Sequence, residues 1–132
     1  MKDSVLNDAR AFPSFSVDDI GKARAFYRDT LGLDVADRPE GLEIEVGGGN
    51  KVFVYGKPDH KPATFTILNF TVDDVDTAVD RLKSTGVQFE HYDQPGIRTD
   101  ERGIARGGEG PTIAWFKDPA GNILSVLQPR AD

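Results

Sequence analysis

The sequence predicts an α+β fold built from two tandem β-α-β-β-β units within a single domain, residues 1–132. Three landmarks occur twice in the same order: a strand ending in Val-Asp-Asp or its equivalent, a helix ending at glycine, and a turn into an apolar strand. They lie at 15–20, Gly32 and 49–54 in the first copy, and at 70–75, Gly86 and 121–126 in the second. Two copies are too few for a solenoid, so we expect one duplicated supersecondary unit.

The first predicted unit spans residues 11–57 and opens with a strand over 11–17. Pro13 cannot donate a hydrogen bond to a β-ladder, which indicates an edge or a bulge there. The aspartate pair at 18–19 supplies N-cap chemistry for a helix with an apolar stripe, and Gly32 is the expected C-cap. The remaining strands are expected at 33–36, 42–46 and 51–55, with a glycine-rich turn at 47–50.

The second predicted unit spans residues 64–129 and repeats this plan after a connector over 56–63. Asp73 or Asp74 is expected to cap its helix. Residues 93–111 form a long loop rich in Gly, Arg and acidic residues, and loops of this length in a compact domain are usually functional or disordered. Strands are expected at 64–72, 87–92, 112–116 and 123–127.

The composition argues against several classes of protein. Hydrophobic residues make up 38% and charged residues 29%, as in ordinary globular domains. The formal net charge of −6 argues against nucleic-acid binding, which needs clustered Lys and Arg. No apolar run reaches about 18 residues and no signal peptide is recognisable, so we expect a cytoplasmic protein without a membrane partner. The absence of cysteine excludes disulfides and thiol chemistry.

Two strings carry a resemblance to a known family. Phe-Tyr at 26–27 is followed by Leu-Gly-Leu at 31–33, and Trp-Phe-Lys-Asp-Pro-Ala-Gly-Asn at 115–122 precedes the last strand. With Val-Asp-Asp before each helix, the chain over 11–129 resembles the vicinal oxygen chelate superfamily, which includes glyoxalase I, extradiol dioxygenases, fosfomycin-resistance enzymes and bleomycin-resistance proteins. The resemblance implies a curved, half-open mixed β-barrel around a central cavity, and a homodimer in which units are sometimes exchanged.

The resemblance also implies where such a fold would bind a divalent metal. Counting from the Val-Asp-Asp and Gly-Asn landmarks leads to Phe12, Phe53, Ile67 and Ser125. Three apolar side chains and one neutral hydroxyl cannot provide the nitrogen and oxygen donors that a divalent ion needs. We therefore expect neither a metal nor another cofactor.

Other catalytic chemistry finds little support in the sequence. We interpret His60 as a solvated histidine of the connector, and His91 as a surface or hydrogen-bonded residue of a strand. No serine lies in a recognisable nucleophile elbow, and neither glycine-rich turn links a strand to a helix as a phosphate cradle requires. The paired aspartates at 18–19 and 73–74 are better explained as helix caps than as acid–base pairs.

The predicted site is the inner face of the barrel. Strand side chains alternate between faces, so residues that share parity with the metal positions should line the cavity. They are Phe12, Ser14, Phe53, Tyr55, Ile67, Asn69, Ser125 and Leu127, with Trp115 added by proximity. Aromatic groups with a few polar ones are typical of a site for a small organic molecule. The alternative is that they fill the barrel as core.

The long loop has two interpretations. Arg98, Arg102 and Arg106 lie in it among acidic residues. They form either a lid that brings a guanidinium group over an oxygen-rich ligand, or surface ion pairs.

Two classes of function compete. The first is a glyoxalase/bleomycin-resistance-like protein, independent of metal, that binds or sequesters a small, partly aromatic organic ligand. The second is a divergent lyase, isomerase or dioxygenase that uses a non-standard site, with Tyr55, His91 or a loop arginine for acid–base chemistry. A dimeric module without a ligand is a third possibility. The missing metal donors favour the first class, and the sequence does not identify the ligand.

Overall fold

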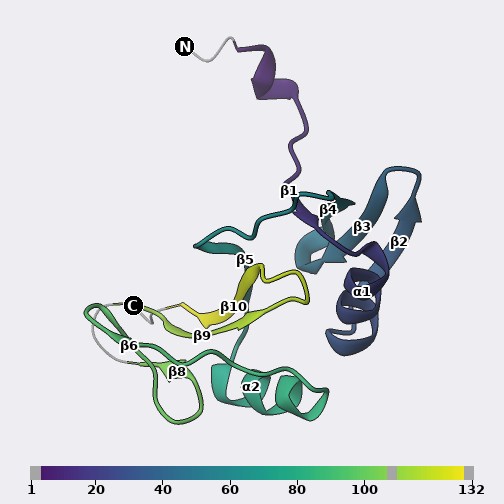
Figure 1. Cartoon of the computed structure of the whole chain (residues 1–132). Coiled ribbons are helices and arrows are strands. Elements are labelled where there is room, and N and C mark those ends of the chain that lie inside the picture. Colours follow the sequence, from purple (N-terminus) through teal and green to yellow (C-terminus); the bar gives the residue numbers. More distant parts are fainter. Residues whose placement is uncertain (1–3, 107–109, 130–132) are drawn as a thin grey trace.

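The computed structural model describes residues 4–106 and 110–129 and contains two β-α-β-β-β units (Figure 1). After the short helix η1 (Val5–Asp8), the first unit consists of β1 (Ser14–Val17), α1 (Ile20–Ala25), the π-helical turn η2 (Phe26–Thr30), β2 (Asp34–Arg38), β3 (Gly41–Val46), η3 (Gly47–Gly49) and β4 (Asn50–Gly56). The second consists of β5 (Thr66–Thr71), α2 (Val75–Ser84), β6 (Asp93–Gln94), β7 (Ile97–Arg98), β8 (Ile104–Ala105), β9 (Thr112–Lys117) and β10 (Ile123–Gln128).

Each unit builds a four-stranded mixed sheet with the same strand order. The order is β1-β4-β3-β2 in the first unit and β5-β10-β9-β8 in the second. In both sheets the first strand runs parallel to the last strand, and the other pairs are antiparallel. The sequence repeat is therefore a repeat of topology. The two sheets stay separate and open, which confirms the α+β, half-open arrangement.

Both α-helices begin at the aspartate pairs, as the sequence predicted. In each pair the second aspartate is the N-cap: Asp19 Oδ1 accepts from Lys22 N at 3.0 Å, and Asp74 Oδ1 accepts from Thr77 N at 3.2 Å. Both helical segments are followed by a glycine with positive φ, as expected of helix ends. The first helix passes into a π turn, in which Leu31 N donates to Phe26 O at 2.9 Å. No described helix is long and apolar enough to span a membrane.

The second unit differs from the prediction in the region before β9. The strand expected at 87–92 is reduced to a single bridge between Phe89 and Phe116. The expected loop at 93–111 contains the β6–β7 hairpin and the short strand β8, and its residues 107–109 lie outside the described residues. Both differences have one cause. β8 pairs with the Ala114 end of β9, so the segment around Phe89 reaches only the other end of the same edge.

The first strand is shorter than expected, because β1 begins at Ser14 and not at residue 11. Pro13 has no N–H to donate, although its carbonyl still accepts from Phe53 N at 3.0 Å. Residues 10–13 therefore lead into the sheet as an extended arm, and Phe12 is 68% exposed.

The hydrophobic core lies on the helix-facing sides of the two sheets. Leu42, Ile44 and Val54 are fully buried in the first sheet, and Phe116 and Leu124 are fully buried in the second. Apolar side chains of α1, η2 and α2 pack against these residues. Strand alternation thus assigns one face of each sheet to the core and leaves the other face available.

A buried polar network joins the units. The Tyr27 hydroxyl donates to Asp118 Oδ2 at 2.7 Å, and Asp118 also accepts from Ala120 N and from both nitrogens of Asn122. The Asn122 amide donates in turn to Ser16 O at 3.0 Å. Burial, together with the nearby Asp118 carboxylate, raises the pKa of the Tyr27 hydroxyl, so this group stays a donor. Because every group in the network has a partner, it fixes one arrangement of the units.

His60 belongs to this joint and is not the solvated residue that the sequence suggested. It is half-buried, with Nδ1 2.6 Å from Ser16 Oγ and Nε2 3.1 Å from Ala120 O. A carbonyl oxygen only accepts, so Nε2 carries the proton. His60 therefore ties the connector to the first strand of one unit and to the last turn of the other.

Candidate functional site: two open sheet faces

The face of each sheet that points away from the helices is incompletely covered. In β4, Val52 and Val54 are buried, whereas Phe53 and Tyr55 are half-buried. The ring of Phe26 in η2 lies 6.4 Å from the ring of Phe116, on the helix side of the second sheet. The helix-covered side of each sheet therefore faces the contact between the units. The two open faces point away from this contact. We call them the first and second open faces.

The first open face carries an aromatic platform. The rings of Phe53 and Tyr55 stack with centroids 6.3 Å apart and an interplanar angle of 18°. In register, Phe53 lies between Ser14 on β1 and Glu43 on β3. Glu43 forms ion pairs with two cationic side chains, Arg38 and Lys51, at 2.9 and 3.5 Å. The platform is thus apolar at its centre and charged toward β3.

The second open face is more polar. Ser125 lies between Asn69 and Trp115 in register, and its hydroxyl donates to Asn69 Oδ1 at 2.5 Å. Trp115 Nε1 donates to Thr66 Oγ1 at 3.2 Å. The rings of Trp115 and Tyr92 meet edge to face, with centroids 5.4 Å apart and an interplanar angle of 82°. This register places Trp115 on the same face as Ser125, a point that proximity along the sequence left open.

The predicted site residues therefore divide between two sheets of one chain. Ser14, Phe53 and Tyr55 belong to the first open face. The second open face contains Asn69, Trp115, Ser125 and Leu127, with half-buried Ile67 beside an irregularity in β5. Phe12 precedes β1 as an exposed side chain.

The sequence analysis did not name three further residues: Glu43 and Tyr92, which extend these faces, and Phe65, which precedes β5. Alternation along 42–46 already placed Glu43 opposite the buried residues of that strand. Phe65 is 67% exposed immediately before β5, as Phe12 is before β1. Tyr92 lies in the segment where a regular strand was expected, so its parity gave no usable signal.

The side chains at the positions where the resemblance implies metal ligands do not fit a divalent ion. Phe53 stacks on Tyr55, and the Ser125 hydroxyl is engaged with Asn69. Phe12 and Ile67 have no donor atoms in their side chains. Among residues 4–106 and 110–129, no three His, Asp or Glu side chains form a group that could hold a metal. The open faces instead offer aromatic surface and a few hydrogen-bonding groups.

Two of the loop arginines lie against α2 and not over an open face. Arg102 pairs with Asp76 and Asp80, and Arg106 pairs with Asp76 and Asp100. Hydrogen bonds from Arg106 and Arg102, with their positive charges, lower the pKa of Asp76 to about 2. The third, Arg98, pairs with exposed Asp93 across the β6–β7 hairpin at 3.6 Å.

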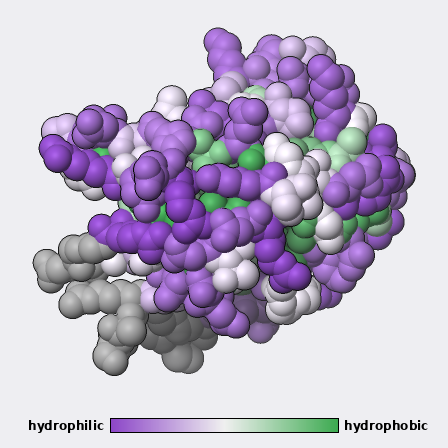
Figure 2. Space-filling model, turned by 90° about the horizontal axis from the view of Figure 1, so that it is seen from below, coloured by the Kyte–Doolittle hydropathy of each residue, from purple (hydrophilic) through white to green (hydrophobic). Residues whose placement is uncertain are grey.

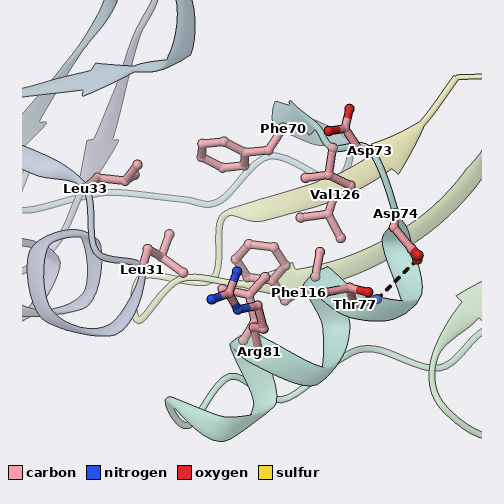
Figure 3. A pocket seen from close by; sticks show the side chains of 12 residues that line it. Leu31, Leu33, Phe70, Asp73, Asp74, Thr77, Arg81, Phe116 and Val126 are labelled. Carbon is pink, nitrogen blue, oxygen red and sulfur yellow. Dashed lines mark hydrogen bonds between the residues drawn. The ribbon is translucent and has the colours of Figure 1, made fainter.

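A pocket of about 470 Å³ opens on the helix side, between the two units. The surface viewed in Figure 2 is mostly hydrophilic, with hydrophobic groups visible in the hollow near its centre. Leu31 and Leu33 of the first unit form one wall of the pocket, and α2 with Phe70, Phe116 and Val126 forms the rest (Figure 3). None of the predicted site residues lines it. The sequence analysis did not name the residues that line this pocket, because its walls come from both units.

Comparison with known proteins agrees with this architecture. The profile of the Glyoxalase/Bleomycin resistance protein/Dioxygenase superfamily matches residues 11–126. The chain belongs to this superfamily. No curated protein matches the sequence.

Several solved structures are similar over almost their whole length. TnmS3, an antibiotic binding protein from Streptomyces sp. CB03234, is 29% identical, with 93% of this chain and 98% of that chain covered and a TM-score of 0.64. A bleomycin resistance determinant encoded on the transposon Tn5 is 23% identical, with coverages of 93% and 99% and a TM-score of 0.68. Lactoylglutathione lyase from Agrobacterium tumefaciens is also 23% identical, with coverages of 92% and 93% and a TM-score of 0.65. The last two show the shared fold alone.

Proposed function

We propose that this protein is a metal-independent binding protein that sequesters a small, partly aromatic organic molecule. The ligand lies between the first open face of one chain and the second open face of another chain in a homodimer. The observation that carries this proposal is the chemistry at the metal positions. Phe12, Phe53, Ile67 and Ser125 stand where donor groups would be needed, and Phe53 instead forms a stacked pair with Tyr55.

A second copy of the chain is the natural cover for these faces. β1 and β5 are edge strands of their sheets, and exposed Phe12 and Phe65 lie beside them. Unpaired edges and exposed aromatic surface favour association, and a two-fold dimer covers the same patch on both copies. Burying one such phenylalanine contributes about 1.5–3 kcal/mol.

The two open faces supply complementary contacts to a ligand. Phe53 and Tyr55 provide a flat surface on which a planar ring stacks, worth about 1 kcal/mol beyond the buried area. Ser125 donates to the oxygen of the Asn69 amide, so the amide NH₂ group is available to donate to a ligand carbonyl. The 29% identity with an antibiotic binding protein over 93% of the chain supports binding over a lyase activity.

Ligand titration after dialysis against EDTA tests the proposal. Metal-free bleomycin and a panel of planar aromatic antibiotics serve as probes, and fluorescence of Trp115, the single tryptophan of the chain, reports occupancy of the second open face. We expect saturable quenching without metal, weakened at least tenfold, about 1.4 kcal/mol, by Phe53→Ala or Trp115→Ala. Because Trp115→Ala removes the fluorophore, calorimetry measures that variant. Phe89→Leu, which changes an aromatic side chain in the core of the second unit, is the control and leaves affinity within about twofold.

Two results would overturn the proposal. One is binding that disappears on chelation and returns with a divalent metal. The other is a monomeric mass at tens of micromolar, on the order of assay concentrations, together with probes that never bind. Sedimentation equilibrium supplies the mass, and a structure with both open faces packed closed would favour the module without a ligand.

A further inference from the structure

We propose a second binding site in the pocket between Leu31, Leu33 and α2. It takes an elongated organic anion, with its apolar body against the leucines and Phe70 and its acidic group at Arg81 (Figure 3). The site lies on the helix side of the second sheet, opposite the second open face. It therefore goes beyond the proposed function and does not depend on it.

The walls of the pocket are apolar and held in place. The volume of about 470 Å³ falls within the range of small-molecule sites, about 300–1,000 Å³. Phe116 and Val126 belong to the core, with exposures of 0% and 3%. The opposite wall is fixed by backbone hydrogen bonds, from Leu31 N to Phe26 O and from Leu33 N to Tyr27 O, each 2.9 Å. Walls held by the core and by backbone hydrogen bonds need little rearrangement on binding, which favours an apolar occupant.

Arg81 supplies a positive charge at the pocket without an ion-pair partner among the described residues. This sets it apart from Arg102 and Arg106, which pair with acidic residues on the other side of the same helix. An arginine left unpaired beside an apolar surface favours a carboxylate or sulfonate, to which its guanidinium donates two parallel hydrogen bonds.

The carboxylates of the pocket lie at its other end and orient the ligand. Asp74 is already engaged as the cap of α2, and Asp73 precedes it. The helical rise from Asp74 to Arg81 is about 10 Å. The anionic group of the ligand is therefore attracted at the Arg81 end of the pocket and repelled at the Asp73 end. A ligand that fits has an apolar body between these ends and a neutral or cationic group at the end near Asp73.

An occupant of this pocket touches both units and so stabilises the native arrangement. A ligand that binds only the folded chain raises its thermal unfolding midpoint with concentration. The same occupant would leave the open faces free, so the two sites can be filled together.

The test uses 1-anilinonaphthalene-8-sulfonate, a fluorescent aromatic sulfonate, on the folded full chain, with decanoate as competitor. We expect one probe bound per chain, displaced by decanoate, and a rise in the unfolding midpoint. Arg81→Gln weakens the probe at least about fivefold, since a charge-assisted pair is lost. The matched control Lys83→Gln, an exposed lysine on the same helix, stays within about twofold. Asp73→Asn tightens binding.

Further variants separate this site from the others. Leu33→Trp fills the pocket and abolishes probe binding, while Trp115→Ala leaves it unchanged. The proposal is overturned if Arg81→Gln has no effect, if no probe binds, or if Trp115→Ala removes the signal, which would locate the probe at the second open face. Probe binding that appears only on dilution to monomers would instead assign the pocket to a contact between chains. Circular dichroism confirms that each variant is folded. If Leu33→Trp does not fold, Arg81→Gln, which leaves the core intact, decides whether the probe binds at this pocket.

Discussion

In the first unit the last strand presents the stacked rings of Phe53 and Tyr55, whereas in the second unit the last strand presents Ser125, bound to Asn69. The strand orders and the capping aspartates of the two units correspond. Residues on the helix side keep the core filled in both units, so they have little freedom to change. Residues on the open faces do not bear that constraint, and there one duplicated framework acquired an aromatic half and a polar half.

The units also differ in how the helix connects to the last strands. In the first, β2 and β3 form a tight hairpin. In the second, the segment from Asp93 to Ala105 carries a hairpin and β8, and Arg102 and Arg106 attach it to Asp76 on α2. Gly21 holds the corresponding place in α1. The arginine–aspartate cluster is thus an addition specific to the second unit.

Breaking the joint between the units has the largest expected effect. Asp118→Ala removes the acceptor of the Tyr27 hydroxyl, of one N–H of the Asn122 side-chain amide and of two backbone N–H groups, so the free energy of unfolding falls by about 3 kcal/mol or more. Urea denaturation measures it. Tyr27→Phe removes one donor and costs about 1–2 kcal/mol. An Asp118→Ala variant within about 1 kcal/mol of the wild type would contradict a joint that depends on this network.

Removing side chains from the two open faces sharpens the comparison of aromatic and polar halves. Phe53→Ala weakens ligand binding at least tenfold, about 1.4 kcal/mol, because it removes the stacking surface. Asn69→Ala weakens it less, by about 0.5–1.5 kcal/mol, the net value of one hydrogen bond. Isothermal titration calorimetry of both variants with the same ligand shows which substitution weakens binding more. If Asn69→Ala proves the more damaging, the second open face supplies the dominant contact and the comparison is reversed.

Ser125→Ala affects stability more than ligand binding. Ser125 is fully buried, and its loss deprives Asn69 Oδ1 of a donor, which costs about 1 kcal/mol of unfolding free energy. Chemical denaturation measures the loss, with Ser14→Ala on the exposed edge strand as control. Equal stability of Ser125→Ala and the wild type would show that the hydrogen bond is replaced by water.

The smallest expected effect is the pH dependence of the arginine–aspartate cluster. The pKa of Asp76 is about 2 in the folded chain and about 3.9 when unfolded, so its stabilising effect is complete above pH 4 and is lost as the pH falls through about 2. At pH 6, Asp76→Asn lowers the thermal unfolding midpoint slightly, and the difference from wild type shrinks between pH 4 and 2. A difference that is constant down to pH 2 would contradict the assignment.

The sequence predicted the elements that local chemistry specifies. The aspartate caps, the helix-ending glycines, the alternating strand at 42–46 and the apolar strand at 123–127 carry their own signals and are confirmed. β8 could not be predicted, because two residues pair with β9 only when the chain brings them to its edge. His60 was misread for the same reason, since its partners come from both units.

The candidate site was predictable only in part. Parity along β4 identified the residues that leave the core, whereas Ser125 on β10 lies on the predicted face but is fully buried. The register adds Trp115 to the second open face. How the faces are oriented depends on η2 packing against Phe116, a contact between units that no periodicity reports. The residues that line the pocket at Arg81 could not be named for the same reason.

The most direct test of a metal-independent cavity shared between two chains is a mixed dimer of Phe53→Ala and Trp115→Ala chains, assayed by calorimetry in the presence of EDTA. Each homodimer binds the ligand weakly, because every cavity lacks one aromatic side chain. In the mixed dimer, one cavity combines the intact Phe53 of one chain with the intact Trp115 of the other, so we expect one site of wild-type affinity per mixed dimer. Failure of mixing to restore any tight site would contradict the shared cavity.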